Sequence, residues 1–184
     1  EVGTELAWDN AAEAGVPCTF FINKFDDPEA DFDRVFGQLQ EKFGASVCPV
    51  TVPVKNGKDI VLIDLVTMKA FNFDAKGVPS EVAMSDDLLS VANDHKESFN
   101  EALAMVSEEL MEKVLMEEEI SSEEAAGAIH DGIVSGSIVP VFCGSSLTLA
   151  GVSTLLSAAV DSFPKFTSKK EEKLLYSRRD SYGK

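Results

Sequence analysis

Residues 16–26 read Val-Pro-Cys-Thr-Phe-Phe-Ile-Asn-Lys-Phe-Asp, so an apolar run passes directly into a polar motif. The apolar part is typical of a buried strand, and a loop after such a strand lies at the carboxyl edge of an α/β sheet, where ligands bind. There Asp26 can accept two hydrogen bonds from the base edge that only guanine offers as donors. Asn23 can tie the loop together and touch the purine, while the methylene stem of Lys24 can lie along the ring. We therefore predict a guanine-recognition loop, with an ordinary polar turn as the alternative.

A second apolar run, Ser137–Cys143, is followed by Gly144 and then by Ser145, Ser146 and Leu147. An amphipathic stretch over residues 149–163 comes next. This loop resembles the Ser-Ala-x loop of GTPases, in which backbone N–H groups point at the guanine carbonyl oxygen and small residues let the main chain approach closely. We predict that it forms the other half of the site. A Gly-Ser-Ser turn between a strand and a helix is also an ordinary loop, so that alternative stays open.

The two loops are about 120 residues apart, whereas a plain βαβ unit needs about 30, so a segment is inserted between them. The order of these features and several strings outside the loops resemble the G domain of the elongation factor G family, the ribosomal translocation GTPases. The match runs from about residue 1 to residue 164. The strings that carry it are residues 2–8, 21–26, 30–35, 63–70, 108–113 and 138–145.

The resemblance implies an α/β fold: part of a P-loop-type GTPase parallel sheet with an inserted α+β subdomain, a small antiparallel sheet plus helices. We place the C-terminal half of the GTPase domain at residues 1–45 and 135–164. The inserted subdomain is placed at 46–134, and residues 165–184 form a charged tail.

Hydrophobic periodicity supports this organisation independently of the resemblance. Leu6 and Trp8 are expected to contact the core from the first helix, and Phe25 to pack inward. Asn56-Gly57 is a strong hairpin signal, and Ser121 and Glu124 have capping-box spacing. The predicted helices are 4–15, 32–44, 86–106, 107–116 and 121–134, and the predicted strands of the insertion are 47–54, 60–66 and 68–73.

The motifs that hold phosphates are not found in residues 1–184, because no G-x-x-x-x-G-K-[ST] string occurs. Asp74–Gly77 satisfies D-x-x-G but follows the guanine motif, so we predict a hairpin turn there. His95 and His130 are expected on helix surfaces, without the catalytic role of the histidine in translational GTPases. The chain is therefore expected to be a fragment of a longer GTPase that binds GTP or GDP. It should lack the Mg²⁺ site and should not hydrolyse GTP alone.

The formal net charge is −16, and it is uneven. From Lys165 onward seven Lys or Arg face three acidic residues, so the tail carries +4 and the rest about −20. The strongly acidic residues before Lys165 repel the phosphate backbone of nucleic acids. This argues against direct contact with nucleic acid and favours a protein partner. The resemblance implies the ribosome, through stalk proteins of the large subunit that contact the insertion.

Compartment and redox state follow from composition. No apolar run of 18 residues predicts a membrane span, and the start does not read as a signal peptide. Cys18, Cys48 and Cys143 are odd in number and lie in apolar runs, which favours reduced thiols. We expect a cytoplasmic protein.

Two functional classes remain open. The first is a segment of a ribosome-associated GTPase, with ribosomal protection proteins and peptide-release GTPases as relatives that the sequence does not separate from elongation factor G. The second is a non-catalytic interaction module, in which the insertion binds a protein and the two loops are only structural.

Overall fold

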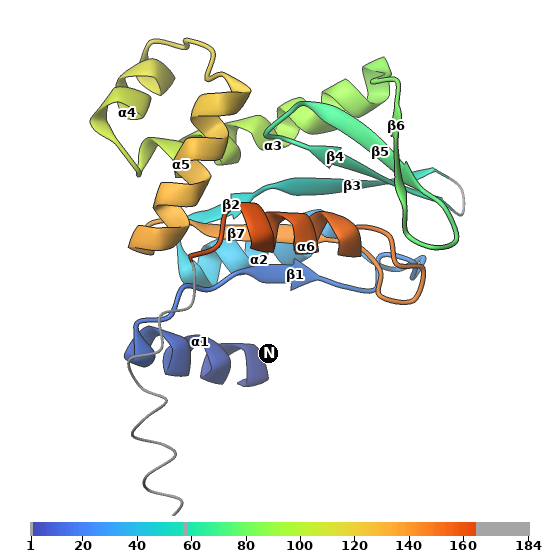
Figure 1. Cartoon of the computed structure of the whole chain (residues 1–184), viewed down its shortest axis with the longest axis horizontal. Helices are drawn as coiled ribbons and strands as arrows, with labels where there is room; N and C mark the ends of the chain where they lie inside the picture. The colour runs from blue at the N-terminus through green and yellow to red at the C-terminus, as the bar shows by residue number, and fades with distance from the viewer. Residues whose placement is uncertain (1, 57–58, 165–184) are drawn as a thin grey trace, which may run out of the picture.

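A computed structural model describes residues 2–56 and 59–164, and it divides the strands between two sheets (Figure 1). A three-stranded parallel sheet has the order β1-β7-β2, formed by Phe20–Ile22, Val139–Cys143 and Val47–Pro49. A four-stranded antiparallel sheet follows the chain order β3-β4-β5-β6. The predicted α/β class, a parallel sheet together with a separate small antiparallel sheet, is confirmed.

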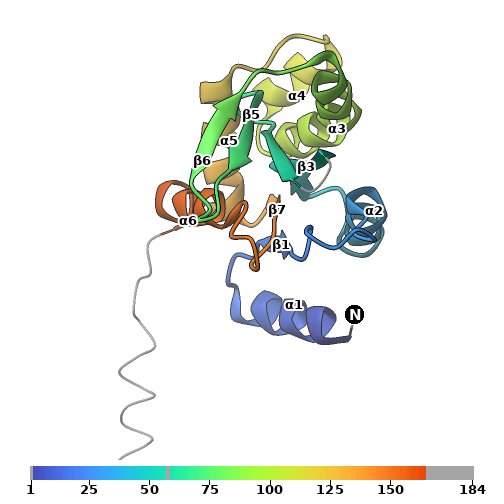
Figure 2. The ribbon, with the colours of Figure 1, turned by 90° about the vertical axis from the view of Figure 1, so that its right-hand side faces the viewer.

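Helices lie on both faces of the parallel sheet. Helix α2 (Phe32–Phe43) lies on one side and α6 (Val152–Asp161) on the other, as the two perpendicular views show (Figures 1 and 2). Asp31 caps α2 by accepting a hydrogen bond from the N–H of Arg34 at 3.0 Å, and Gly44 ends it at a φ of 87°. Strand β7 is buried at every position because it is paired on both sides.

The run at 47–54 was predicted as one strand of the insertion, and this is wrong. It forms β2 in the parallel sheet and β3 (Thr51–Asn56) in the antiparallel sheet, with the chain changing sheets at Val50. The N–H of Val50 donates to Val141 at 2.9 Å, while its carbonyl accepts from Leu65 at 3.0 Å. Both halves are apolar because both are buried, so alternation alone gave no sign of the break. Residues 47–49 thus pair with the sheet predicted for the GTPase half.

The antiparallel sheet continues with β4 (Asp59–Asp64), β5 (Lys69–Phe73) and β6 (Pro79–Val82). Asn56 pairs with Asp59 across the first hairpin, although Gly57 lies outside the described residues. The turn predicted at Asp74–Gly77 is confirmed: Asp74 Oδ1 accepts from the N–H groups of Lys76 and Val78 at 2.8 and 2.9 Å. Strand β6 was not predicted, because it is only four residues long, begins with a proline and is exposed at its first three positions.

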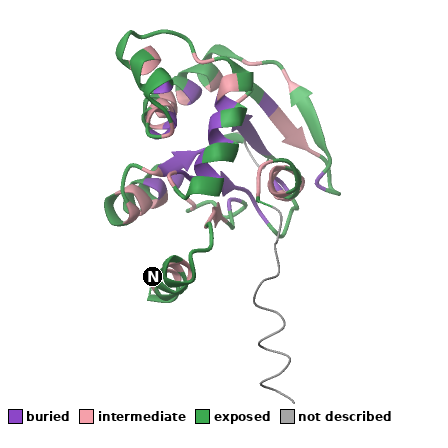
Figure 3. Ribbon diagram, turned by 60° about the vertical axis from the view of Figure 1, so that its left-hand side comes forward, coloured by how far each residue is buried: buried purple, intermediate pink, exposed green. Residues whose placement is uncertain are grey.

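Three helices complete the insertion: α3 (Asp86–Ala104), α4 (Glu108–Leu115) and α5 (Ser122–Ser135). All three were predicted to within two residues at each end. Their N-caps are Ser85, Ser107 and Ser121. Helix α3 contributes Phe99 and Leu103 to the same buried core as the strands, which form the purple interior of Figure 3.

The first helix, α1 (Val2–Ala14), packs less closely than predicted. It has no buried residue (Figure 3) and lies beyond the edge strand β1 (Figure 1). Trp8 does stack on Phe20, with ring centroids 5.8 Å apart, and contacts Phe43 at 4.6 Å. Leu6 is 60% exposed, so its predicted core contact is wrong. The helix is held through the Trp8 ring and through an ion pair between Glu5 and Lys42 at 2.6 Å.

The histidines, the cysteines and the lengths of the helices can each be compared with what the sequence predicted. His130 is exposed, as predicted, but His95 is only partly exposed: its side chain is 13% exposed, lies edge-on to Phe32 and bonds Asp33 at 3.1 Å. Cys18, Cys48 and Cys143 are all free thiols. None of the described helices is both long and apolar enough to cross a membrane.

The capping box of α5 generates a pH prediction. Lys113 and the backbone and hydroxyl of Ser121 all bond Glu124 and lower its pKa from 4.5 to about 2. Because the pKa is depressed in the folded state, its stabilising contribution is present above pH 4.5 and is lost as the pH falls to about 2. We expect Glu124→Gln to be less stable than the parent in urea unfolding at pH 7, with the gap closing from pH 4.5 to 2. Glu123→Gln, an exposed neighbour, is the control, and a gap that does not change with pH contradicts the assignment.

Candidate functional site

The two predicted loops meet because β1 and β7 are adjacent parallel strands that end at the same edge of the sheet. Backbone hydrogen bonds join them just beyond the last pair. Gly144 donates to the carbonyl of Ile22 at 3.0 Å, and Phe25 donates to the carbonyl of Gly144 at 3.1 Å. Segments about 120 residues apart in sequence are thereby fixed side by side.

Asn23 links the loops through its side chain. Its Nδ2 donates to the hydroxyl of Ser146 at 3.0 Å, and its Oδ1 accepts from the N–H of Ser146 at 2.9 Å. Only a side-chain amide offers a donor and an acceptor in this arrangement, which explains why the position holds Asn.

Asp26 and Ser145 form the second link. The hydroxyl of Ser145 donates to Oδ1 of Asp26 and accepts from the N–H groups of Leu147 and Thr148, both at 3.2 Å. Ser145 is fully buried, whereas Asp26 is exposed. A carboxylate has about four lone-pair sites, so Asp26 keeps acceptor capacity for a ligand.

Between these links, Lys24 and Phe25 point to different surroundings. Phe25 is 5% exposed, so its predicted inward packing is confirmed. Lys24 is exposed and has a φ of 65°, a left-handed conformation that costs a non-glycine residue about 1–2 kcal/mol. The structure thus holds strained backbone inside the predicted motif, which is common where a loop is shaped for a ligand.

The N–H groups of the second loop already have protein partners. That of Ser145 donates to Ala150 at 2.9 Å, that of Ser146 to Asn23, and those of Leu147 and Thr148 share the Ser145 hydroxyl. A base carbonyl would therefore have to share or replace one of these bonds. The two 3.2 Å bonds are the longest, which makes Leu147 and Thr148 the most easily released donors.

Sequence patterns did not identify all the residues that shape the second loop. A Cβ on Gly144 would lie 2.1 Å from the carbonyl oxygen of Ala150, so only glycine fits there. Gly77, in the β5–β6 turn, packs against Leu149, and its carbonyl accepts from Ser153 at 3.1 Å. The requirement for small residues in this loop could have identified Gly144 from the sequence. The Gly77 contacts join segments far apart in the chain, and no local pattern indicates them.

The buried thiol next to the site is unreactive. Cys143 ends β7 directly before the loop, and burial raises the pKa of its thiol to about 12. The side chain therefore stays a neutral thiol. The backbone N–H of Cys143 donates to Thr51 Oγ1 at 3.0 Å. Among residues 2–56 and 59–164, no cluster of three or more His, Cys, Asp or Glu is arranged to hold a metal ion.

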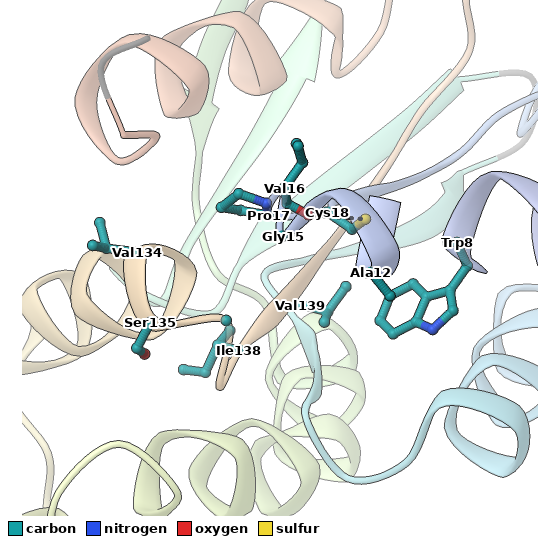
Figure 4. A pocket seen from close by; sticks show the side chains of 11 residues that line it. Trp8, Ala12, Gly15, Val16, Pro17, Cys18, Val134, Ser135, Ile138 and Val139 are labelled. Carbon is teal, nitrogen blue, oxygen red and sulfur yellow. Dashed lines mark hydrogen bonds between the residues drawn. The ribbon is translucent and has the colours of Figure 1, made fainter. Parts of the chain in front are cut away.

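A cavity of about 250 Å³ lies at the opposite end of the parallel sheet (Figure 4). It is formed around the starts of β1 and β7, where Cys18 and Val139 lie, and by the ends of α1 and α5. No charged side chain lines it, so it offers no cation for a phosphate and no carboxylate for the paired donors of guanine. The loops at the carboxyl edge remain the candidate site.

Two comparisons with known proteins bear on this site. The profile of the family described as the elongation factor Tu GTP binding domain matches residues 1–165. Among solved structures, the crystal structure of ttk003000868 from Thermus thermophilus is similar, with a TM-score of 0.76 and 28% sequence identity. The match covers 90% of this chain and 25% of that one, so the chain spans about a quarter of the length of the Thermus protein.

The close approach at Gly144 can be tested directly. We expect Gly144→Ala to lower the free energy of unfolding by about 2 kcal/mol, because the new methyl group would overlap the Ala150 carbonyl. Gly127→Ala in α5 is the matched control, since its Cβ meets nothing within 4 Å; it should stabilise the helix by about 0.8 kcal/mol. Equal effects in urea unfolding would contradict the packing described here.

Proposed function

Because the chain belongs to the elongation factor Tu GTP-binding domain family of translational GTPases, we propose that its paired loops recognise the guanine base of GTP or GDP. One observation supports this above the others. The two side-chain links, Asn23 with Ser146 and Asp26 with Ser145, hold the two loops at one edge of the sheet while leaving Asp26 exposed.

The chemistry of the base fits these residues. Guanine presents N1–H and a 2-amino group as neighbouring donors, and the Asp26 carboxylate accepts both. The stem of Lys24 covers the ring face. Backbone N–H groups of Ser146 or Leu147 donate to the carbonyl oxygen of the base, once released from Asn23 or the Ser145 hydroxyl. Adenine offers the opposite pattern and leaves Asp26 without partners.

Base contacts alone bind weakly. Two charge-assisted hydrogen bonds contribute about 3–6 kcal/mol, against about 4 kcal/mol or more for lost translational and rotational freedom. The residues described here thus support at best millimolar affinity. We propose that tight nucleotide binding, Mg²⁺ binding and hydrolysis depend on a phosphate-binding segment outside residues 1–184, in a longer protein of the elongation factor G type.

The domain organisation belongs to the same proposal. Residues 1–45 and 135–164 supply the GTPase half and 46–134 the insertion, with residues 47–49 paired in the sheet of the former. The protein is proposed to act on the ribosome in the cytoplasm, without direct nucleic-acid contact from this acidic chain.

The insertion carries a surface suited to a protein partner. On and just after α4, the side chains of Met111, Leu115 and Met116 are 47%, 78% and 69% exposed. Glu112 and Glu117 are exposed beside them. Exposed apolar side chains rimmed by charge are typical of protein interfaces, and the resemblance suggests a stalk protein of the large ribosomal subunit as the partner.

Substituting Asp26 tests guanine recognition. Asn replaces one acceptor with a donor, which matches xanthine, so Asp26→Asn should weaken GDP binding roughly tenfold or more and strengthen XDP binding. NMR titrations with millimolar GDP, XDP and ADP measure this, with Asp27→Asn as the control. Unchanged selectivity would favour the non-catalytic interaction module instead.

The partner surface has its own test. We expect Leu115→Glu to abolish most binding of purified ribosomal stalk protein in a pull-down with this chain. Leu156→Glu places the same charge at a 62% exposed leucine of α6 and should bind normally. Equal binding by both variants and the parent would exclude α4 as the contact.

A further inference from the structure

A lysine of the inserted sheet contacts the first loop. Lys55 lies in β3, and its Nζ donates to the backbone carbonyls of Asp27, Pro28 and Ala30 at 2.9, 2.9 and 2.8 Å. An ammonium group has three protons, and each has an acceptor here. All three acceptors belong to the segment that directly follows Asp26.

The ammonium of Lys55 also lies above an aromatic ring of the motif. Its Nζ is 5.2 Å from the centroid of Phe25, within the range of a cation–π interaction. Phe25 stands between Lys24 and Asp26 and is itself buried. Lys55 therefore holds the loop both at the motif and just beyond it.

The segment that Lys55 contacts is rich in oxygen acceptors. Residues 26–31 include Asp26, Asp27, Glu29 and Asp31, all exposed, and three carbonyl oxygens of this segment converge on one point. The three converging carbonyl oxygens repel one another, and the ammonium group of Lys55 offsets that repulsion. Asp31 has a separate partner, because Arg34 Nε lies 3.9 Å from its carboxylate. The tight turn itself depends on the same atoms, because the Asp27 carbonyl that Lys55 binds also accepts from the N–H of Ala30 at 3.1 Å.

We propose that Lys55 is a positioning residue for guanine recognition, one that fixes the conformation of residues 25–30 and so the direction of the Asp26 carboxylate. This role for Lys55 rests on the proposed function. Lys55 does not touch the base. Its contribution comes from a strand of the insertion, so the insertion takes part in the geometry of the site as well as in binding a partner.

Another lysine of the same sheet provides a matched control. Lys69 in β5 forms a surface ion pair with Glu81 at 2.8 Å, and its side chain is 50% exposed. Exposed pairs of this kind contribute little. Replacing Lys69 removes the same charge from the same sheet without touching the loop.

The experiment uses the 184-residue chain and two NMR measurements on each variant: amide hydrogen exchange, and shift titration with GDP and with ADP. In Lys55→Met we expect the amides of Asp27 and Ala30 to exchange about tenfold faster and the GDP affinity to fall about three- to tenfold. The preference for GDP over ADP should fall with it. Lys69→Met should match the parent, and Lys55→Arg, which keeps the charge and several donors, should recover most of both properties.

The controls separate the possible failures. Amides of Ile63 and Phe99 in the core report global unfolding, and Lys55→Gln, which keeps much of the side-chain length, replaces Lys55→Met if that variant does not fold. Unchanged loop exchange overturns the inference. Faster loop exchange with unchanged GDP affinity overturns it too, while leaving the proposed function intact. If the parent chain binds GDP no better than ADP, the proposed function fails and this inference fails with it.

Discussion

The parallel pairing of β1 with β7 is the constraint on which the site depends. It places the ends of two distant segments at one edge of the sheet. There the backbone of Gly144 hydrogen-bonds those of Ile22 and Phe25. Side-chain hydrogen bonds then join Asn23 to Ser146 and Asp26 to Ser145. Each of these bonds needs the strands in this register. A shift by one residue would turn Asp26 away from Ser145 and bury a charge where Phe25 now packs, at a cost of several kcal/mol.

The inserted residues are tied to that edge from two directions. Lys55 reaches the first loop from β3, and the turn containing Gly77 packs against Leu149 beside the second loop. The insertion thus contacts both loops through short contacts. The same insertion continues to α4, because α4 packs on α3 and α3 on β3.

Local patterns predicted the elements that depend on local chemistry. The capping box at Ser121 and the turn at Asp74 follow from residues three or four apart, and both were found. Contacts between distant segments were not predictable in this way. Nothing near Lys55 in sequence indicates three carbonyls from residues 27–30, and the sheet change at Val50 is hidden in an unbroken apolar run. The exposure of Leu6 likewise depends on which face of α1 packs against the rest of the protein, and this is a contact between distant segments. For the site, the two loops chosen from their residue types do lie together in the fold. That the N–H of Ser146 already donates to Asn23 could be seen only in the structure.

We propose that the Asp26 carboxylate recognises guanine by the paired N–H donors of the base, at the junction of the two loops. A crystal structure of the chain grown with tens of millimolar GMP tests it most directly. We expect density for the base against Lys24, with N1 and the 2-amino group within about 3.2 Å of the Asp26 carboxylate and the carbonyl oxygen facing the N–H groups of residues 146–147. A base bound elsewhere, or AMP bound at the same place under the same conditions, would contradict it.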